Sequence, residues 1–243
     1  MPGAREATFI RADRWRLPSL CAVCRGWGKS RVCAECMTRF AAIVPRCQRC
    51  ALPVPADVAV CGACLASAPR FDAAIARVDY GFPWDRLIAG FKFHSALDLA
   101  DVLARAIVSA RGAMPPADAT DLLLPVPLSA ARLRERGYNQ AWEIARRVAR
   151  RVGLAADASL LLRIRDTSHQ IALPVEERGD NVRGAFAVEP RRRSELRGRA
   201  IALIDDVMTT GSTAAEIART LKEAGAARVA VWVVARTPRP GDD

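Results

Sequence analysis

Eight cysteines in the first quarter of the chain limit what that segment can fold into. They form four C-x-x-C pairs between residues 21 and 64, and the 243-residue chain contains no other cysteine. A C-x-x-C turn points two thiolates at one cation, and two such turns supply the four sulfur ligands that tetrahedral zinc takes at about 2.3 Å. The pattern predicts two structural zinc ions with these ligands: Cys21, Cys24, Cys33, Cys36, Cys47, Cys50, Cys61 and Cys64.

The spacing leaves open which cysteine pairs share a metal ion. Eight residues separate the first two pairs and ten separate the last two, which suits two successive ribbons with one zinc each. A cross-braced arrangement, in which the first and third pairs share a zinc, would use the same residues. Prolines around the second half favour turns over long helices. We expect this zinc module to cover residues 1–68.

Composition narrows the class of protein and its location. No apolar run approaches the ~20 residues that a membrane span needs, and the first residues lack the apolar centre of a signal peptide. We therefore expect a cytoplasmic protein, in which paired cysteines bind metal rather than form disulfides. The net charge of +11 suits a polyanionic partner such as nucleic acid, and equally a chain that prefers arginine throughout.

Residues 201–216, IALIDDVMTTGSTAAE, combine a short apolar run, two acids, a hydroxyl-rich stretch and the start of a helix. The apolar run is typical of a parallel strand covered on both faces. Such a strand delivers Asp205 and Asp206 to its carboxyl end, where open α/β sheets bind their ligands.

The loop after the acids suits an anion, because its backbone N–H groups and hydroxyls are close together and Gly211 permits a tight turn. Thr213 and Glu216 match a capping box, so we expect a helix to begin at Thr213 with its positive end facing the same anion. The residues alone therefore predict a sugar-phosphate site, in which the loop residues would contact the phosphate: Thr209, Thr210, Gly211, Ser212 and Thr213.

Further apolar runs at residues 74–78, 122–126 and 229–235 predict buried strands with helices between them. The fold class expected for residues 69–243 is α/β, a mainly parallel sheet with flanking helices. Residues 139–152 predict a helix whose arginine-rich face we interpret as solvated rather than as a nucleic-acid surface. Lys92 could contact a substrate, but we favour a lysine on the solvated side of a helix.

Residues 201–216 resemble the motif that binds phosphoribosyl pyrophosphate (PRPP) in type I phosphoribosyltransferases. The chain as a whole resembles the ComF family, which is associated with DNA uptake in competent bacteria. The cysteine ribbons, LLLPVPLSAARLRERGYNQ at 122–140 and RIRDTSHQIALPVEERGDNVRGAF at 163–186 carry this resemblance. It implies a type I phosphoribosyltransferase fold behind a double zinc ribbon, with PRPP and magnesium as ligands.

The resemblance also implies roles for single residues. Asp205 and Asp206 would bind the ribose 2′ and 3′ hydroxyls, residues 209–213 the 5-phosphate, and residues 125–129 the pyrophosphate. Residues 165–181 would close over PRPP, and a nitrogen nucleophile would displace pyrophosphate from the anomeric carbon. The candidates in these two loops are Pro127, Leu128 and Ser129 for binding, and Gln170 and Arg178 for catalysis.

Three functions stay open at this point. The chain could be a transferase, a competence protein that binds single-stranded DNA or partner proteins with PRPP as effector, or a PRPP sensor that docks partners through its zinc module. The acceptor does not follow from the sequence. Neither does the oligomeric state, for which a dimer is one option.

Overall fold

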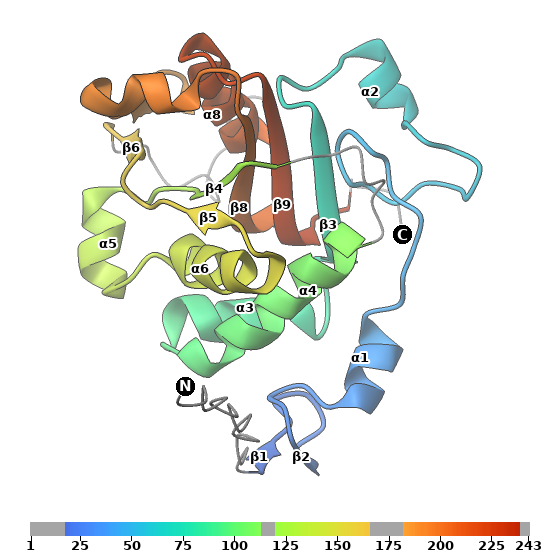
Figure 1. Ribbon diagram of the computed structural model, residues 1–243. Helices are drawn as coiled ribbons and strands as arrows, with labels where there is room; N and C mark the ends of the chain where they lie inside the picture. Colours follow the sequence, from blue (N-terminus) through green and yellow to red (C-terminus); the bar gives the residue numbers. More distant parts are fainter. Residues whose placement is uncertain (1–17, 113–119, 166–181, 239–243) are drawn as a thin grey trace, which may run out of the picture.

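The centre of the molecule is a five-stranded sheet in the order β3-β9-β8-β4-β5 (Figure 1). The computed structural model describes residues 18–112, 120–165 and 182–238. All four strand pairings within this sheet are parallel, which confirms the predicted fold class. The strands are β3 (Ala73–Asp79), β4 (Leu122–Pro125), β5 (Ala155–Ala156), β8 (Ala200–Met208) and β9 (Arg228–Arg236).

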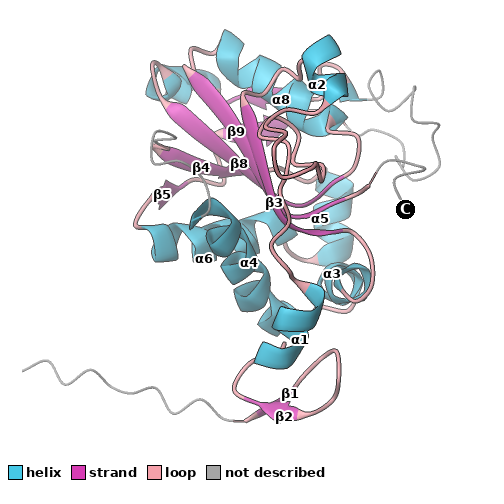
Figure 2. Ribbon diagram, turned by 90° about the vertical axis from the view of Figure 1, so that its right-hand side faces the viewer, coloured by secondary structure: helices cyan, strands magenta, loops and turns pink. Residues whose placement is uncertain are grey.

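Helices lie on both faces of the sheet (Figure 2). One face is covered by α3 (Trp84–Phe93), α4 (Ala100–Gly112) and α6 (Gln140–Val152), with η1 (Leu97–Leu99) leading into α4. The other face is covered by α8 (Ser212–Glu223), η3 (Pro190–Leu196) and the hairpin of β6 (Leu161–Arg163) and β7 (Phe186–Val188). The short helix α5 (Ala130–Arg136) follows β4. None of the helices among the described residues has both the length and the apolar character that a membrane crossing requires.

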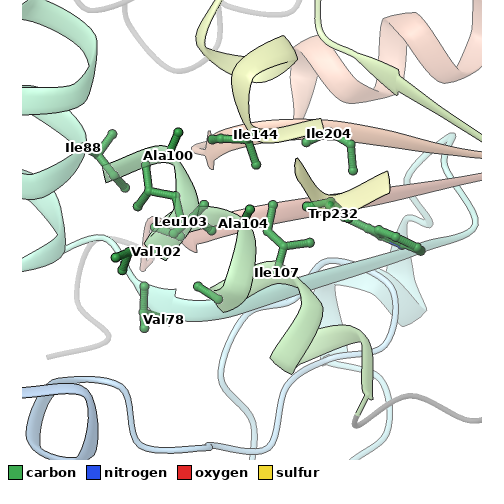
Figure 3. Close-up of a cluster of buried hydrophobic side chains, with 14 of the residues drawn as sticks. Val78, Ile88, Ala100, Val102, Leu103, Ala104, Ile107, Ile144, Ile204 and Trp232 are labelled. Atoms are coloured by element: carbon green, nitrogen blue, oxygen red, sulfur yellow. The ribbon is translucent and has the colours of Figure 1, made fainter. Parts of the chain in front are cut away.

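The central strands are apolar throughout because their alternate side chains enter two different cores. On β9, Trp232 and Val234 pack towards α4, whereas Val231 and Val233 pack towards α8. Figure 3 shows the first core, in which Trp232 lies with Leu103 and the other labelled apolar side chains of α3, α4, α6 and the sheet. Burial on both faces fixes the carboxyl ends of the strands, and those ends carry the candidate site.

Each cysteine segment combines a tight turn with a short helix. The first contains the antiparallel pair β1 (Ser19–Leu20) and β2 (Trp27–Gly28), then α1 (Ala34–Phe40); the second contains α2 (Gly62–Ala66). The first lies beneath α3 and α4 and the second beside the edge strand β3 (Figures 1 and 2). The domain boundary at residue 68 stays a prediction.

Candidate phosphate-binding site and metal centres

Strand β8 carries the two predicted acids to the carboxyl edge of the sheet. Asp206 is 2% exposed, while Asp205 is partly buried and accepts a hydrogen bond from the backbone N–H of Asp206 at 2.9 Å. Removal from water, and then the nearby Asp206 carboxylate, raise the pKa of Asp205 well above its usual range, although Lys92 opposes this shift. Two adjacent acidic side chains, one buried and one partly buried, therefore lie at the end of a central strand.

Lys92 belongs to this site, which overturns its interpretation as a solvated lysine. Its Nζ lies 3.0 Å from Asp206 Oδ2, because α3 crosses the carboxyl ends of the strands. Burial works against a charged ammonium, but Asp206 and Asp205 outweigh it and raise the pKa of Lys92. The contact is an ion pair, and Oδ2 accepts no well-formed hydrogen bond from any residue that the structure describes. A buried carboxylate oxygen with unused accepting capacity indicates a place for a ligand hydroxyl.

The loop after β8 has the compact shape that the sequence predicted. Gly211 adopts a left-handed φ of 86°, and a Cβ there would lie 3.6 Å from the ring of Phe71 and 3.7 Å from Met208 Sδ. The Thr210 and Ser212 hydroxyls are 2.8 Å apart, and the Ser212 N–H donates to Thr210 Oγ1 at 3.3 Å. These contacts turn the loop into the first turn of α8.

The predicted capping box is wrong. Helix α8 begins at Ser212 rather than Thr213, and its N-cap residue, Gly211, has no side chain to cap it. Glu216 instead accepts a hydrogen bond from the Gly184 N–H at 2.7 Å and pairs with Arg219 at 2.6 Å. The Gly184 amide, far away in sequence, is a better partner for the buried carboxylate than the helix end. The N-terminus of α8, with its positive dipole end, follows directly on the loop, where an anion could bind.

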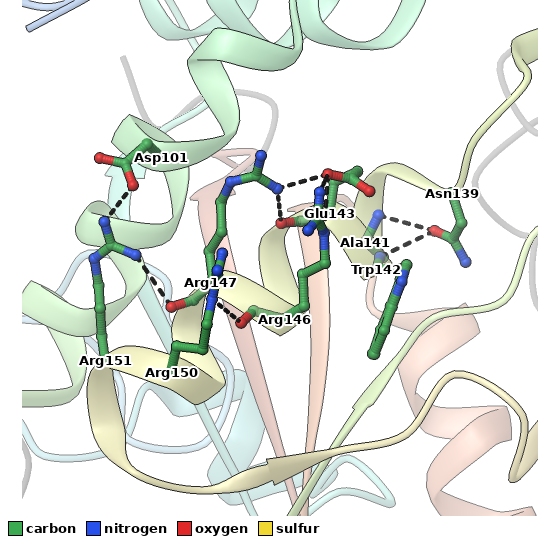
Figure 4. Close-up of polar contacts among 9 residues, drawn as sticks. All are labelled: Asp101, Asn139, Ala141, Trp142, Glu143, Arg146, Arg147, Arg150 and Arg151. Carbon is green, nitrogen blue, oxygen red and sulfur yellow. Dashed lines mark hydrogen bonds and ion pairs between the residues drawn. The ribbon is translucent and has the colours of Figure 1, made fainter.

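The loop of residues 125–129 lies beside the acid pair because β4 pairs with β8. Ser129 is buried, and its Oγ caps α5 by accepting from the Arg132 N–H at 3.3 Å. Pro127 and Leu128 are half-buried. Asn139 donates its amide to the Val126 carbonyl at 3.1 Å, while its side-chain oxygen caps α6 (Figure 4). Asn139 thus fixes this loop relative to α6.

The neighbouring Tyr138 explains part of a sequence block whose purpose the sequence did not reveal. Its hydroxyl donates to the Phe91 carbonyl, and the two rings pack with centroids 5.9 Å apart. Tyr138 therefore ties the segment before α6 to α3, directly beside Lys92. The spacing Gly137-Tyr138-Asn139-Gln140 gave no sign of this contact, which depends on where α3 lies.

The arginine row on α6 is largely paired within the protein (Figure 4). Arg146 and Arg147 both contact Glu143, the second at 2.6 Å, and Arg151 pairs with Asp101 on α4. Such pairing reduces the charge that this face offers to a polyanion. The interpretation of this face as solvated rather than DNA-binding stays a prediction, and so do the roles of Gln170 and Arg178, which lie outside the described residues.

The cysteines form two sequential tetrads, so the cross-braced alternative is excluded. Within each tetrad, formed by residues 21–36 or 47–64, the Sγ atoms all lie within 4.8 Å of one another. Cys24 and Cys33 Sγ are 3.8 Å apart, and Cys50 and Cys61 Sγ are 3.7 Å apart. A tetrahedral zinc with sulfur at about 2.3 Å requires sulfur separations of about 3.8 Å. The residues therefore fit the predicted zinc ions.

Backbone amides support the same conclusion. The Cys33 N–H donates to Cys21 Sγ at 3.3 Å, and the Cys61 N–H donates to Cys47 Sγ at the same distance. Burial opposes ionisation of Cys21, but amides of Cys24, Cys33 and Val23 outweigh it and lower its pKa to about 6. Thiolates stabilised in this way are the form that binds metal.

Comparisons with known proteins agree with this arrangement. Residues 13–65 match the double zinc ribbon domain family, and residues 110–242 match the phosphoribosyl transferase domain family. The DNA utilization protein YhgH of Salmonella typhimurium is 33% identical over 232 residues, 91% of this chain and 98% of that protein. Competence protein F of Haemophilus influenzae is 31% identical, over 89% of this chain and 96% of that protein.

Among solved structures, the glutamine phosphoribosylpyrophosphate amidotransferase of B. subtilis is 22% identical over 56% of this chain and 25% of that chain, with a TM-score of 0.35. The matches to the two sequence relatives cover almost the full length of both chains. The chain therefore belongs to the ComF family of competence-associated DNA utilization proteins, in which a double zinc ribbon precedes a phosphoribosyltransferase domain.

Proposed function

We propose that this protein binds PRPP at the carboxyl end of β8 and either transfers or senses its phosphoribosyl group. The observation that carries the proposal is the buried Asp206 carboxylate, which has accepting capacity left beside Lys92 and lies directly before a glycine turn into a long helix. Ligand hydroxyls would donate hydrogen bonds to the acids, and a phosphate would accept hydrogen bonds from the backbone N–H groups of the loop.

Each part of PRPP has a matching part of the site. Asp205 and Asp206 would bind the ribose hydroxyls, residues 209–213 the 5-phosphate, and residues 125–129 the pyrophosphate. Lys92 makes such a site workable for an anion, because its ammonium neutralises one of the two carboxylates. Carboxylate oxygens are ligands that magnesium accepts, and magnesium bound with PRPP would neutralise pyrophosphate charge. Gln170 and Arg178 would contact PRPP from the closing loop.

For a transferase, the protein itself mainly positions reactants. The ribosyl centre becomes positive as pyrophosphate leaves, so orientation and electrostatic stabilisation would dominate the rate. A loop that closes over the site would keep water from the ribosyl centre. No side chain of the protein has to act as nucleophile.

A second function has support of its own. Relatives named for DNA utilization and competence, together with a net charge of +11, favour a cytoplasmic protein that binds single-stranded DNA or competence proteins, with PRPP as an effector. The two functions differ in one respect: a transferase releases pyrophosphate when an acceptor is present, and an effector-bound protein does not.

Calorimetric titration with magnesium and PRPP tests the shared step. We expect the wild-type protein to bind, Asp205→Ala and Asp206→Ala to bind at least tenfold more weakly, and Asp98→Ala, a surface acid, to bind as the wild type does. Equal binding by all four proteins would contradict the proposed site. Assays of pyrophosphate release with nitrogen nucleophiles, including free nucleobases, then separate transferase from sensor.

A further inference from the structure

Arg236, the last residue of β9, is a buried arginine that joins the second cysteine tetrad to the start of residues 209–213, the phosphate loop. It is 6% exposed. Its Nε donates to the Cys50 carbonyl at 2.9 Å, and its Nη1 donates to the Met208 carbonyl at 3.0 Å and to the Thr209 carbonyl. One guanidinium therefore contacts the backbone of a metal ligand and the backbone of the loop.

Packing supports the same link. Ala51, the residue after Cys50, is fully buried in the core that also contains Met208 and Phe71. Phe71 is the ring that lies closest to the space beside Gly211. The turn of the second tetrad is thus linked to the loop by the Arg236 guanidinium and by a shared apolar core.

We propose that Arg236 is a positioning residue through which the second zinc site sets the shape of residues 209–213 and hence the affinity for PRPP. This inference rests on the proposed PRPP site. With zinc bound, the Cys47–Cys50 turn is fixed, the Cys50 carbonyl is held against the guanidinium, and the Met208 and Thr209 carbonyls are fixed in turn. Because coupling between two ligands is reciprocal, PRPP should stabilise zinc in the second tetrad by the same factor.

The first ribbon offers a matched control. Arg77 of β3 donates Nη1 to the Ala42 carbonyl at 3.1 Å, so it also joins a strand arginine to a carbonyl near a cysteine tetrad. Among the described residues it makes no hydrogen bond or ion pair with the phosphate loop, so its loss should leave PRPP binding unchanged.

The experiment compares Arg236→Met with Arg77→Met by titration with magnesium and PRPP, using full-length protein with measured zinc content. We expect at least tenfold weaker binding for Arg236→Met and a change of less than twofold for Arg77→Met. Equal affinities in the two variants would overturn the inference. If Arg236→Met does not fold, Arg236→Lys replaces it, since a lysine keeps the charge but cannot reach both the Cys50 and the Met208 carbonyls with a planar fork.

Zinc release to a coloured chelator provides a second measurement on the unaltered protein. We expect saturating PRPP to slow the release of one of the two zinc ions. In Arg236→Met, PRPP should no longer slow it. If PRPP changes neither release rate in the unaltered protein, the proposed coupling is overturned. A wild-type protein that binds no PRPP would instead refute the proposed function, and faster zinc release from Arg236→Met than from Arg77→Met would still support the link to the metal.

Discussion

The two cysteine tetrads have nearly the same backbone but meet the rest of the protein in different ways. In the first, the Cys21 N–H donates to the Gly26 carbonyl, and in the second the Cys47 N–H donates to the Leu52 carbonyl, both at 2.8 Å. The residue after each turn is left-handed, with φ of 63° at Arg25 and 59° at Ala51. Arg25 is exposed, whereas Ala51 is fully buried.

The two zinc-binding turns therefore contact different parts of the protein. The first ribbon packs on α3, where Trp84 donates its Nε1 to the Phe40 carbonyl at 2.6 Å. The second is joined to the phosphate loop by Arg236, and its Ala51 lies in the same apolar core as Met208. We infer that the first ribbon stabilises the start of α3, at Trp84, whereas the second ribbon supports the phosphate loop directly.

Removing one zinc ligand from each tetrad gives the largest expected contrast. Cys24→Ser and Cys50→Ser should each reduce the zinc content from two ions to one. Each should also lower the unfolding free energy by several kcal/mol, because zinc binding contributes folding energy. Hydrogen exchange should rise at residues 205–213 in Cys50→Ser and not in Cys24→Ser. Equal exchange in this segment for both variants would remove the distinction.

Trp84→Phe tests the docking of the first ribbon. The change leaves the Phe40 carbonyl without its donor and removes buried volume, so we expect a loss of about 2–3 kcal/mol in unfolding free energy. PRPP affinity should change by less than twofold. Chemical denaturation measures the first quantity and calorimetry the second; a large loss of affinity would mean that the first ribbon also supports the site through α3.

Replacing each of the two left-handed residues, Arg25 and Ala51, by glycine should change the stability of the protein by different amounts. Arg25→Gly should stabilise the protein by about 1 kcal/mol, since it relieves backbone strain at an exposed position. Ala51→Gly relieves similar strain but removes a methyl group, worth about 0.8 kcal/mol, from a core that includes Met208. We expect it to be near neutral or destabilising. The opposite order in thermal unfolding would show that Ala51 is not packed as described.

The smallest contrast concerns two ion pairs. Arg46 and Asp79 lie 2.7 Å apart with the Arg46 side chain 10% exposed, and Arg31 and Asp98 lie 2.6 Å apart with both side chains more exposed. Asp79→Asn should lower the unfolding free energy by about 1 kcal/mol, because the largely buried guanidinium of Arg46 loses its charged partner. Asp98→Asn should lower the unfolding free energy by less than about 0.5 kcal/mol, and this loss should disappear in high salt. Equal losses of unfolding free energy in the two variants, both reduced by salt, would contradict the expected difference between the two ion pairs.

The sequence predicted the sheet and the zinc ligands well because both depend on local patterns. Residues 201–204 and 229–235 are continuous apolar runs, and they lie in β8 and β9 as expected. The cysteine spacing identified the ligands, but it could not choose between sequential and cross-braced pairing, because either arrangement satisfies the same turns. Only the positions of the Sγ atoms decide it.

The details of the site were less predictable, because they depend on contacts between distant segments. Lys92 lies on a helix whose distance from Asp206 no local pattern reveals. Glu216 matched a capping box, but the Gly184 amide competes for it and wins. Arg236 ends an apolar strand, and no local pattern predicts a buried charge there that donates to three separate parts of the backbone.

A crystal structure of the protein with magnesium and PRPP tests the central claim most directly. The account predicts the 5-phosphate within hydrogen-bond reach of the backbone N–H groups of residues 209–213, and the ribose hydroxyls on the carboxylates of Asp205 and Asp206. PRPP bound elsewhere, or a loop whose amides turn away from the phosphate, would contradict it.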